Sequence, residues 1–547
     1  MSSFNDDAAP KPARGAAPDL PSVGEVVEIA GSGSRIRMAA DILAQLQTNK
    51  DPAVSMSGQV GSQVKMAVGN AWLIANVRTM AAGEGNEIVA HVDFLGEGSR
   101  DSSGTMSRFR RGVTRYPIPG AKVFPVTTDD LRSVFAADDS AHIEIGTVYP
   151  TDDIRGALYV DPMLSKHFAV LGSTGTGKST SVSLILHRIS QLSPEGHIVM
   201  IDPHGEYSAA FKDCGELFNV DNLQLPYWLM NFEEHCEVLL TTHGAERQRD
   251  GDILAKCILA ARTKGKDLSQ YGKVTVDSPI PYLLTDLTTI ITNEMGKLDR
   301  AGDTLPYQRL KTKLDELKAD PRYTFMFSGM LVSDSMPSFL SRLFRLPANG
   351  RPISIVDVSG VPSEITSVVV SVLARMVFDY AIWSRTEAQR PLLLVCEEAH
   401  RYVPKDESSG AQAVRKILER IAKEGRKYGV SLGLITQRPS DLAEGVLSQC
   451  GTIISMRLNN DRDQACVRAA MPEGARGFLD AIPALRNREC IVCGEGVSIP
   501  IRVRFDDLEP EKRPASSDPS FAALWRETGG EEGIIQRTVK RWRGHGR

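Results

Sequence analysis

The run from Gly172 to Ser179, GSTGTGKS, constrains this chain more than any other feature of its sequence. It matches the pattern G-x-x-x-x-G-K-[ST] in full, with an apolar strand candidate (HFAVLG, 167–172) before it and a helical pattern (SVSLILHRISQL) after it. Gly175 gives the loop an extra position that can turn tightly, so that successive backbone N–H groups can face one cavity. Such donors at the start of a helix bind phosphate oxygens. The run therefore predicts a phosphate-binding loop (P-loop) between a strand and a helix of an α/β fold.

The residue types in this loop also predict the ligand. The ammonium of Lys178 can reach the β- and γ-phosphates of a nucleoside triphosphate, and the hydroxyl of Ser179 can bind Mg²⁺. We therefore expect ATP and Mg²⁺ as cofactors and hydrolysis of ATP as the reaction. The expected nucleotide-binding residues are Gly172, Ser173, Thr174, Gly175, Thr176, Gly177, Lys178, Ser179 and Thr180.

Two adjacent acidic residues, Glu397 and Glu398, follow another apolar run, LLLVC (392–396). This places them at the carboxyl end of a buried strand, where α/β sheets hold their ligands. We expect Glu397 to bind the magnesium ion, and Glu398 to orient and deprotonate the attacking water. The alternative is a pair of carboxylates that caps a helix start. Two adjacent ionised groups repel each other unless a cation is near, which favours the functional interpretation.

Two more strand candidates end in polar residues. Asp202, in IDPHGEY, is expected to face the same edge as the P-loop, where it would polarise the water or lie in the outer magnesium shell. The alternative is a turn, because Asp-Pro and His-Gly are common turn dipeptides. Gln437, in TQRP, could hydrogen-bond the γ-phosphate and report its presence. The alternative is a strand ended by proline beside a glutamine of no special role.

Arg426 follows a helical pattern that begins near Arg415 and ends near Gly425. An exposed arginine in this position can enter the site of a neighbouring subunit and neutralise charge in the transition state. The alternative is a cation at a helix C-terminus, which the helix dipole favours by itself.

The periodicity of apolar residues divides the chain into several predicted domains. Six apolar strand candidates alternate with helical patterns, at 167–172, 197–202, 353–358, 392–397, 431–436 and 452–458. This alternation predicts an α/β fold, with a RecA-like parallel sheet core and helices on both faces. Short alternating runs between glycine turns predict a small β-barrel before this core. The expected ranges are a disordered tail at 1–21, the β-barrel at 22–145, the core at 146–207 and 351–500, a helical insertion at 208–350, and a C-terminal arm and tail at 501–547.

Composition excludes some classes of protein. The net charge of −4 and the pI of about 6.3 imply that any nucleic-acid surface is local. The most apolar helical pattern, 368–383, contains Arg375 and Asp379, so we interpret it as a buried core helix and expect no membrane contact.

The eight cysteines are scattered, and the one C-x-x-C, Cys490 to Cys493, lacks the second pair that zinc needs. Ordinary core thiols and a cytoplasmic location are expected.

Taken together, GSTGTGKST, VMIDPHGEYS, VDVSGVPSEI, VCEEAHRYVP, EGRKYGVSLGLITQRPS and RVRFDDLEP resemble the HerA branch of the HerA/FtsK ATPases, in the order of that family and over roughly residues 22–510. The resemblance implies a homo-hexameric ring that moves double-stranded DNA. It implies a β-barrel that docks partners, either a nuclease of the NurA type or a defence effector such as a Sir2-like or nuclease protein. It also implies a C-terminal segment that wraps a neighbouring subunit, a family role for Glu397, and an arginine finger at Arg426.

We therefore expect an ATP-driven double-stranded DNA translocase or helicase that powers an associated nuclease, in DNA end processing or antiviral defence. One alternative is a nucleotide-gated ring scaffold that assembles a defence effector without DNA translocation. Another is a motor for protein or conjugative DNA secretion, which would normally have a membrane anchor. The identity of the partner does not carry over from the family, because the docking barrel is its most variable part.

Overall fold

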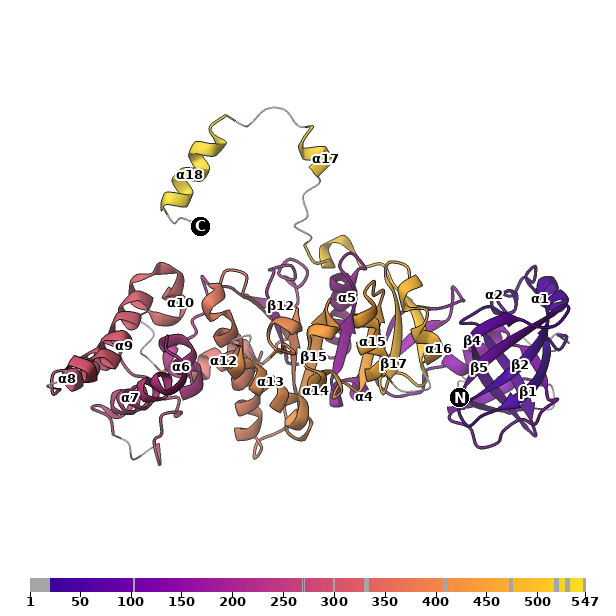
Figure 1. Ribbon diagram of the computed structural model, residues 1–547, viewed down its shortest axis with the longest axis horizontal. Helices are drawn as coiled ribbons and strands as arrows, with labels where there is room; N and C mark the ends of the chain where they lie inside the picture. Colours follow the sequence, from indigo (N-terminus) through magenta and orange to yellow (C-terminus); the bar gives the residue numbers. More distant parts are fainter. Residues whose placement is uncertain are drawn as a thin grey trace, which may run out of the picture.

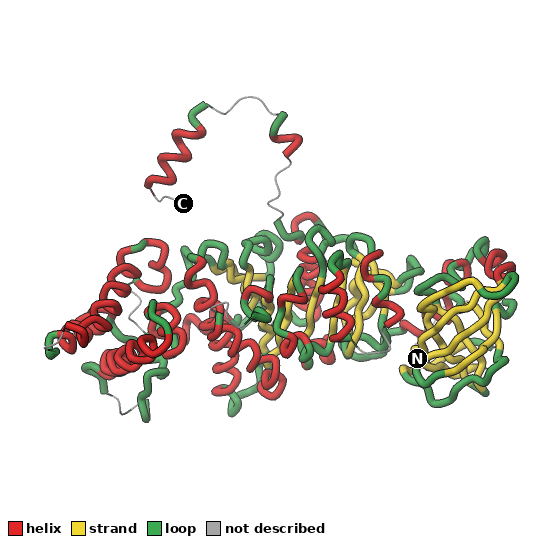
Figure 2. Tube along the Cα trace, in the orientation of Figure 1, coloured by secondary structure: helices red, strands yellow, loops and turns green. Residues whose placement is uncertain are grey.

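A β-barrel, a central sheet flanked by helices and a cluster of helices lie in that order along the long axis of the molecule (Figures 1 and 2). The computed structural model describes residues 20–101, 104–267, 269, 271–298, 301–328, 334–406, 411–471, 476–515, 521–526 and 532–544. The tail expected at 1–21 lies outside the described residues, apart from Leu20 and Pro21.

The N-terminal part is a closed barrel, as predicted. Its strands follow the order β2-β1-β7-β3-β4-β5-β6, and a further pairing of β2 with β5 closes the ring. Strand β2 shows why the alternation predicted this: Ile36 and Met38 are buried in the barrel while Arg35 and Arg37 are exposed. The elements are β1 Gly24–Ile29, β2 Gly33–Ala39, α1 Ala40–Leu46, α2 Pro52–Ser55, β3 Gln63–Val68, β4 Ala71–Ala82, β5 Glu87–Arg100, β6 Met106–Arg111, β7 Lys122–Pro125 and α3 Thr128–Phe135.

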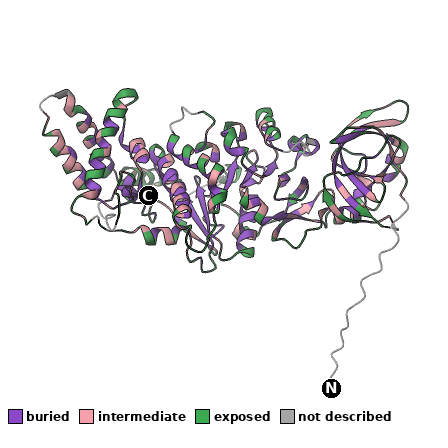
Figure 3. Ribbon diagram, turned by 90° about the horizontal axis from the view of Figure 1, so that it is seen from below, coloured by how far each residue is buried: buried purple, intermediate pink, exposed green. Residues whose placement is uncertain are grey.

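The central part is an α/β core built on a sheet with the order β12-β13-β11-β14-β15-β10-β16-β17-β18-β8-β9. Strands β12 to β16 in this order pair in parallel, and their residues are almost entirely buried because helices cover both faces (Figure 3). All six strands predicted for the core are present. The parallel strands are β10 Phe168–Leu171, β11 Ile198–Asp202, β12 Gly215–Phe218, β13 Ile353–Asp357, β14 Leu392–Cys396, β15 Val430–Thr436 and β16 Thr452–Met456.

The sheet continues beyond β16 with antiparallel strands outside the six that were predicted for the core. They are β17 Glu489–Gly494, β18 Ile501–Phe505, β8 His142–Val148 and β9 Arg155–Tyr159. Strand β18 lies in the range expected to be a C-terminal arm, and β8 begins in the range expected to belong to the barrel. Each of these strands finds its partner far away in the chain, so its local pattern could not show which sheet it joins.

Helices cover the sheet and form the cluster at the far end. Helices α7 and α9 contain the two long helical patterns of the predicted insertion. The range predicted for that insertion also contributes the edge strand β12. The helices are α4 Val160–Ser165, α5 Lys178–Leu192, α6 Phe232–Leu239, α7 Gly244–Thr263, α8 Leu284–Met295, α9 Ala301–Ala319, α10 Thr324–Phe327, α11 Met336–Leu343, α12 Ser363–Trp383, α13 Gln412–Glu424, α14 Glu444–Leu447, α15 Asp461–Ala470, α16 Arg476–Leu479, α17 Phe521–Leu524 and α18 Ile534–Gly544.

Among the described residues, α12 is the one helix long and apolar enough to cross a membrane, and 67% of its most apolar window is buried inside the protein. Val369, Leu373 and Phe378 on this helix are fully buried in the main core. Helix α12 is therefore a core helix of the α/β part, as its sequence predicted.

A buried ion pair joins α12 to the helical cluster. Arg375 on α12 donates to Glu234 on α6 at 2.9 Å, and Ser371 donates to the same carboxylate at 2.9 Å. The backbone N–H of Asn231 donates to Glu234 as well, at 2.8 Å, which completes a capping box at the start of α6. Glu234 is fully buried, so its charge depends on these donors.

We predict that Glu234→Ala destabilises the protein by about 3–5 kcal/mol, because it removes the buried carboxylate and leaves Arg375 with only the more exposed Asp379 as counter-charge. Glu233→Ala is the matched control: Glu233 is the adjacent residue and pairs with Lys416 on the surface, so about 0–1 kcal/mol is expected. Thermal unfolding and limited proteolysis of the α6–α9 region would measure both. Equal melting temperatures for the two variants would contradict the structural role of Glu234.

Candidate nucleotide-binding site

The P-loop follows β10 and leads directly into α5. Gly175 and Gly177 have φ angles of 78° and 91°, in the left-handed region that glycine adopts readily, and Gly177 caps α5. The hydroxyl of Thr176 donates to the carbonyl of Ser173 at 2.7 Å, which closes the loop on itself. The N-terminus of α5 is thereby directed at the loop cavity, in the arrangement that binds phosphate.

Lys178 meets both predicted carboxylates. Its Nζ lies 3.8 Å from Glu397 Oε1 and 3.7 Å from Glu398 Oε1, and all three side chains are buried. Lys178 follows β10, and the two glutamates follow β14. Strand β15 lies between these two strands, because it pairs with β10 on one side and with β14 on the other. The two backbones are therefore roughly 10 Å apart, a gap that the long lysine side chain spans.

Glu397 lies in the more enclosed environment. Burial raises its pKa to about 8, although the charge of Lys178 acts in the opposite direction. The hydroxyl of Tyr207 donates to its Oε2 at 3.1 Å, and burial raises the pKa of that phenol, which therefore stays protonated. Ser179 also lies within hydrogen-bonding reach of Tyr207. The two predicted magnesium ligands, Ser179 and Glu397, thus converge on one tyrosine.

A hydroxyl and one carboxylate fit Mg²⁺ bound with a nucleotide. Magnesium commonly takes one or two protein ligands and completes its octahedron with phosphate oxygens and water. No group of three or more His, Cys, Asp or Glu side chains suited to a metal ion occurs among the described residues. Ser179 and Glu397 therefore suit an ion that arrives with the triphosphate, and a resident metal centre is not indicated in this part of the chain.

Glu398 differs from its neighbour in backbone and charge. Its φ angle is 50°, a left-handed conformation that is uncommon for a residue with a side chain and that clusters at functional sites. Burial acts to raise its pKa, but His400, whose Nδ1 lies 3.2 Å from Oε2, and the charge of Lys178 together hold the pKa below its ordinary value. Glu398 is therefore an ionised carboxylate near neutral pH, able to accept a proton.

Asp202 is fully buried at the end of β11, and the turn that follows occupies its carboxylate. Oδ1 accepts from the backbone N–H groups of His204 and Gly205 at 3.1 and 2.9 Å, and Oδ2 accepts from that of Tyr207 at 2.9 Å. Burial raises its pKa despite these donors. In this structure Asp202 fixes the turn that positions Tyr207, and its catalytic role stays a prediction.

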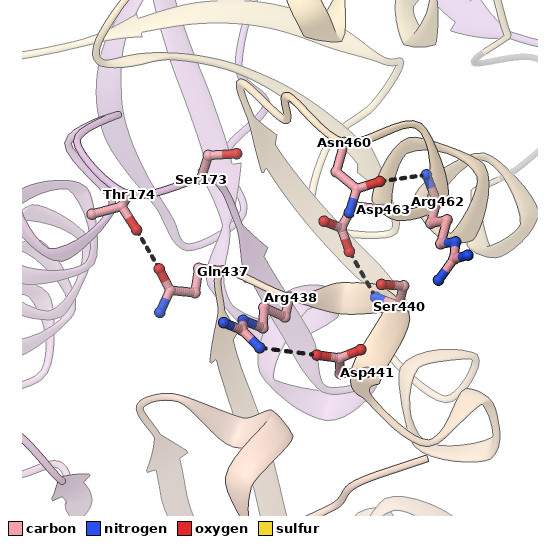
Figure 4. Close-up of a pocket in the computed structure, with 9 residues that line it drawn as sticks. All are labelled: Ser173, Thr174, Gln437, Arg438, Ser440, Asp441, Asn460, Arg462 and Asp463. Carbon is pink, nitrogen blue, oxygen red and sulfur yellow. Dashed lines mark hydrogen bonds and ion pairs between the residues drawn. The ribbon is translucent and has the colours of Figure 1, made fainter. Parts of the chain in front are cut away.

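Gln437 lies at the end of β15, directly beside the P-loop, where the hydroxyl of Thr174 donates to its side-chain carbonyl. Both residues line an open cavity of about 410 Å³, in which Arg438 and Arg462 are the cations (Figure 4). The remaining lining residues are Ser173, Ser440, Asp441, Asn460 and Asp463. The predicted γ-phosphate sensor is thus in contact with the loop that would hold the phosphate.

Arg426 is exposed in a short 3₁₀ turn, Gly425–Tyr428, immediately before β15. The P-loop and Gln437 lie at the opposite, carboxyl ends of the strands. Seven residues of β15 separate the two edges, roughly 23 Å at the usual rise per residue. The side chain of Arg426 therefore cannot reach the P-loop of its own chain.

Three residues of the site were not singled out from the sequence. Tyr207 and His400 lie in the motifs DPHGEY and EEAH, each of which begins with an acidic residue at the end of a strand. A polar side chain a few positions after such a residue was therefore a signal that could have identified both. Arg488, by contrast, had none: its backbone N–H donates to the carbonyl of Thr176 at 2.9 Å, and its side chain lies against Gly177. This contact joins residues more than 300 positions apart.

The sequence matches the family described as "Helicase HerA, central domain" over residues 143–377. It is 27% identical to the "DNA double-strand break repair helicase HerA" of Pyrococcus furiosus, over 84% of this chain and 83% of that protein. It is 24% identical to the protein of the same name from Sulfolobus acidocaldarius, over 78% of this chain and 80% of that protein. Among solved structures, VirB4 of Thermoanaerobacter pseudethanolicus aligns with 69% of this chain and 99% of its own, at a TM-score of 0.49 and 16% identity.

The family match and the HerA-named relatives agree with the strand–P-loop–helix unit, the acidic strand end beside it and the barrel before the core. This chain is a P-loop ATPase that is similar to the HerA helicases, whose central-domain family matches its residues 143–377.

Proposed function

We propose that this protein is an ATP-driven translocase or helicase of double-stranded DNA, that it works as a homo-hexamer, and that it powers an associated nuclease. The observation that carries the proposal is the position of Lys178 within 3.8 Å of two buried carboxylates, Glu397 and Glu398, in a core similar to that of the HerA helicases. The action on DNA is supported by the names of the relatives, which are called DNA repair helicases.

In the proposed reaction, water attacks the γ-phosphate of ATP in line with the leaving group. Lys178 and the N-terminus of α5 bind the phosphates and stabilise the charge that develops on them. Ser179 and Glu397 would hold Mg²⁺, which supplies further positive charge at the phosphates. Glu398 orients the water and accepts its proton, a role that requires the ionised carboxylate found here. Gln437 senses the γ-phosphate through its contact with the P-loop.

Arg426 completes the site of a neighbouring subunit in this proposal. Because it lies at the edge of the sheet opposite the P-loop, it can assist hydrolysis only in another copy of the chain. A ring would bring the exposed turn of one subunit to the nucleotide of the next, which couples hydrolysis to assembly. The β-barrel would dock the partner, a nuclease of the NurA type or a Sir2-like or nuclease defence effector, in the cytoplasm.

The direct test is DNA-stimulated ATPase activity together with displacement of a protein block from duplex DNA. We expect duplex DNA to stimulate hydrolysis and the block to be displaced only with ATP. Lys178→Ala, which removes the phosphate-binding ammonium, should abolish both and serves as the control. A ring that hydrolyses ATP without response to DNA and displaces no block would contradict the translocase and favour a nucleotide-gated scaffold for a defence effector.

Substitution of the two adjacent glutamates should have different effects on ATP turnover and nucleotide binding. Glu398→Gln keeps the shape of the side chain and removes the base, so we expect normal ATP binding and a loss of turnover on the order of 10²–10⁴-fold. Glu397→Gln is the matched variant one residue away and should instead weaken the dependence of nucleotide binding on Mg²⁺. Single-turnover hydrolysis and nucleotide binding would be measured for both. If Glu397→Gln were the tight-binding, slow variant, the two roles would have to be exchanged.

The position of Arg426 predicts complementation between subunits. Arg426→Ala and Glu398→Gln proteins should each be nearly inactive. When mixed, an Arg426→Ala subunit with an intact Glu398 can face a neighbour with an intact Arg426, so measurable ATPase activity should return. Lys427→Ala, the next exposed cation of the same turn, should be active alone. A fully active Arg426→Ala hexamer would remove the finger assignment and leave Arg438 as the next candidate.

A further inference from the structure

Strand β6 of the barrel carries an unusual concentration of arginine. Residues 100–115, RDSSGTMSRFRRGVTR, contain five arginines and one acidic residue, although the whole chain has a net charge of −4. Arg108, Arg110 and Arg111 lie on β6 and Arg115 in the turn after it, and all four are exposed. These four residues are called the β6 arginine row. The fifth, Arg100, stacks on the ring of Trp72 at 4.5 Å.

The β6 arginine row differs from several other cations of the barrel in having no carboxylate within ion-pair distance among the described residues. No ion pair joins any of its four residues to a carboxylate among the residues that the structure describes. Glu97 stands opposite Arg110 in the strand ladder, but its carboxylate accepts from the hydroxyl of Thr114 at 2.6 Å. Cations elsewhere in the barrel that do have carboxylate partners are Arg35, Arg37, Lys65, Arg78, Lys122 and Arg132.

The backbone presents this row to solvent. β6 is the last strand of its sheet, and its ladder pairs are all with β5. The ladder is irregular opposite Glu97 to Ser99, and Arg108 has a φ angle of 52° there, where a left-handed glycine would be unstrained. An arginine kept at a strained position of an exposed edge is typical of a functional surface.

The chemistry of the row fits the phosphate backbone of duplex DNA. Guanidinium groups bind phosphate in a bidentate way. Between residues 104 and 115 no large apolar side chain is exposed, although Tyr116 and Ile118 directly after the row are exposed. DNA interfaces are polar and strongly positive.

The row also lies away from the nucleotide. Arg111 is near Glu495, a residue that follows β17 and is held mainly by Lys166 at 2.8 Å. The end of β17 pairs with Thr452, the first residue of β16, so this region is the edge of the sheet opposite the P-loop. DNA on the row would leave the nucleotide site open.

We propose that the β6 arginine row is a DNA-contacting surface, on which the barrel binds the phosphate backbone of the duplex without reading its sequence. This inference rests on the proposed action on DNA and deepens it. It gives the barrel a function of its own in DNA binding, in addition to the proposed docking of a partner protein.

The test compares two triple variants of the full chain, each of which removes three positive charges. Arg110→Gln/Arg111→Gln/Arg115→Gln neutralises the row; Arg108 is left in place because of its strained backbone. Arg35→Gln/Arg37→Gln/Lys122→Gln is the matched control on ion-paired positions of the same barrel. The affinity for a fluorescent blunt duplex is measured between about 50 and 200 mM salt. Basal ATPase activity and melting temperature report folding.

For the row variant we expect the slope of log K against log salt to fall by about 2 to 3, and the affinity near 150 mM salt to fall on the order of 10- to 100-fold. The control should resemble the wild type, and basal ATPase activity should be unchanged in both. A photo-crosslinking amino acid at position 110, and none at position 37, should capture DNA even if the triple variant folds poorly.

Three negative outcomes of this test have different consequences for the inference and for the proposed function. If the wild type binds duplex DNA and the row variant has the same slope and affinity as the control, this inference is wrong while the proposed function stands. If the row variant keeps DNA binding but loses a bound partner protein, the row is a protein-docking surface, and the inference is also wrong. If the wild type shows no DNA binding and no DNA-stimulated hydrolysis, the proposed function fails and this surface fails with it.

Discussion

The order of three parallel strands determines the geometry of the ATPase site. β15 lies between β10 and β14, so the P-loop and the acidic strand end are kept two strands apart while Gln437 emerges between them. The pairing fixes this spacing through backbone hydrogen bonds that no side chain can adjust. A lysine at the start of α5 is long enough to cross the gap, and Lys178 does so. The carboxylates of Glu397 and Glu398 meet the Lys178 ammonium on the far side of that gap.

Burial gives two adjacent glutamates different properties. Glu397 is the more enclosed of the two, and burial raises its pKa to about 8, so it gains most from a cation that replaces its proton. Glu398 has a lowered pKa because His400 and Lys178 outweigh the effect of burial. Neighbouring carboxylates whose pKa values are driven apart suit different tasks, one as a ligand and one as a base. The left-handed backbone at Glu398 is the local means by which the chain turns the second carboxylate toward His400.

Charge is distributed unevenly over this protein. The chain is slightly acidic overall, and several cations of the barrel are paired with carboxylates. Against this background the exposed, unpaired β6 arginine row and the exposed Arg426 stand out, because each keeps its charge available for a group outside the chain. In our proposals one meets DNA and the other meets the nucleotide of a neighbour. Net charge alone would have excluded neither surface and located neither.

The sequence by itself determined the parts that depend on local pattern. The P-loop, the six core strands, the barrel and the acidic strand end at Glu397 and Glu398 were all predicted, because glycine placement and apolar periodicity act over a few neighbouring residues. Tertiary structure decided what depends on partners distant in the chain. The strands β18 and β8 extend the core sheet, Tyr207 reaches Glu397, and Arg488 supports the P-loop at Thr176. Each of these contacts joins segments whose own patterns are compatible with many partners, and only the packing of the whole fold selects one.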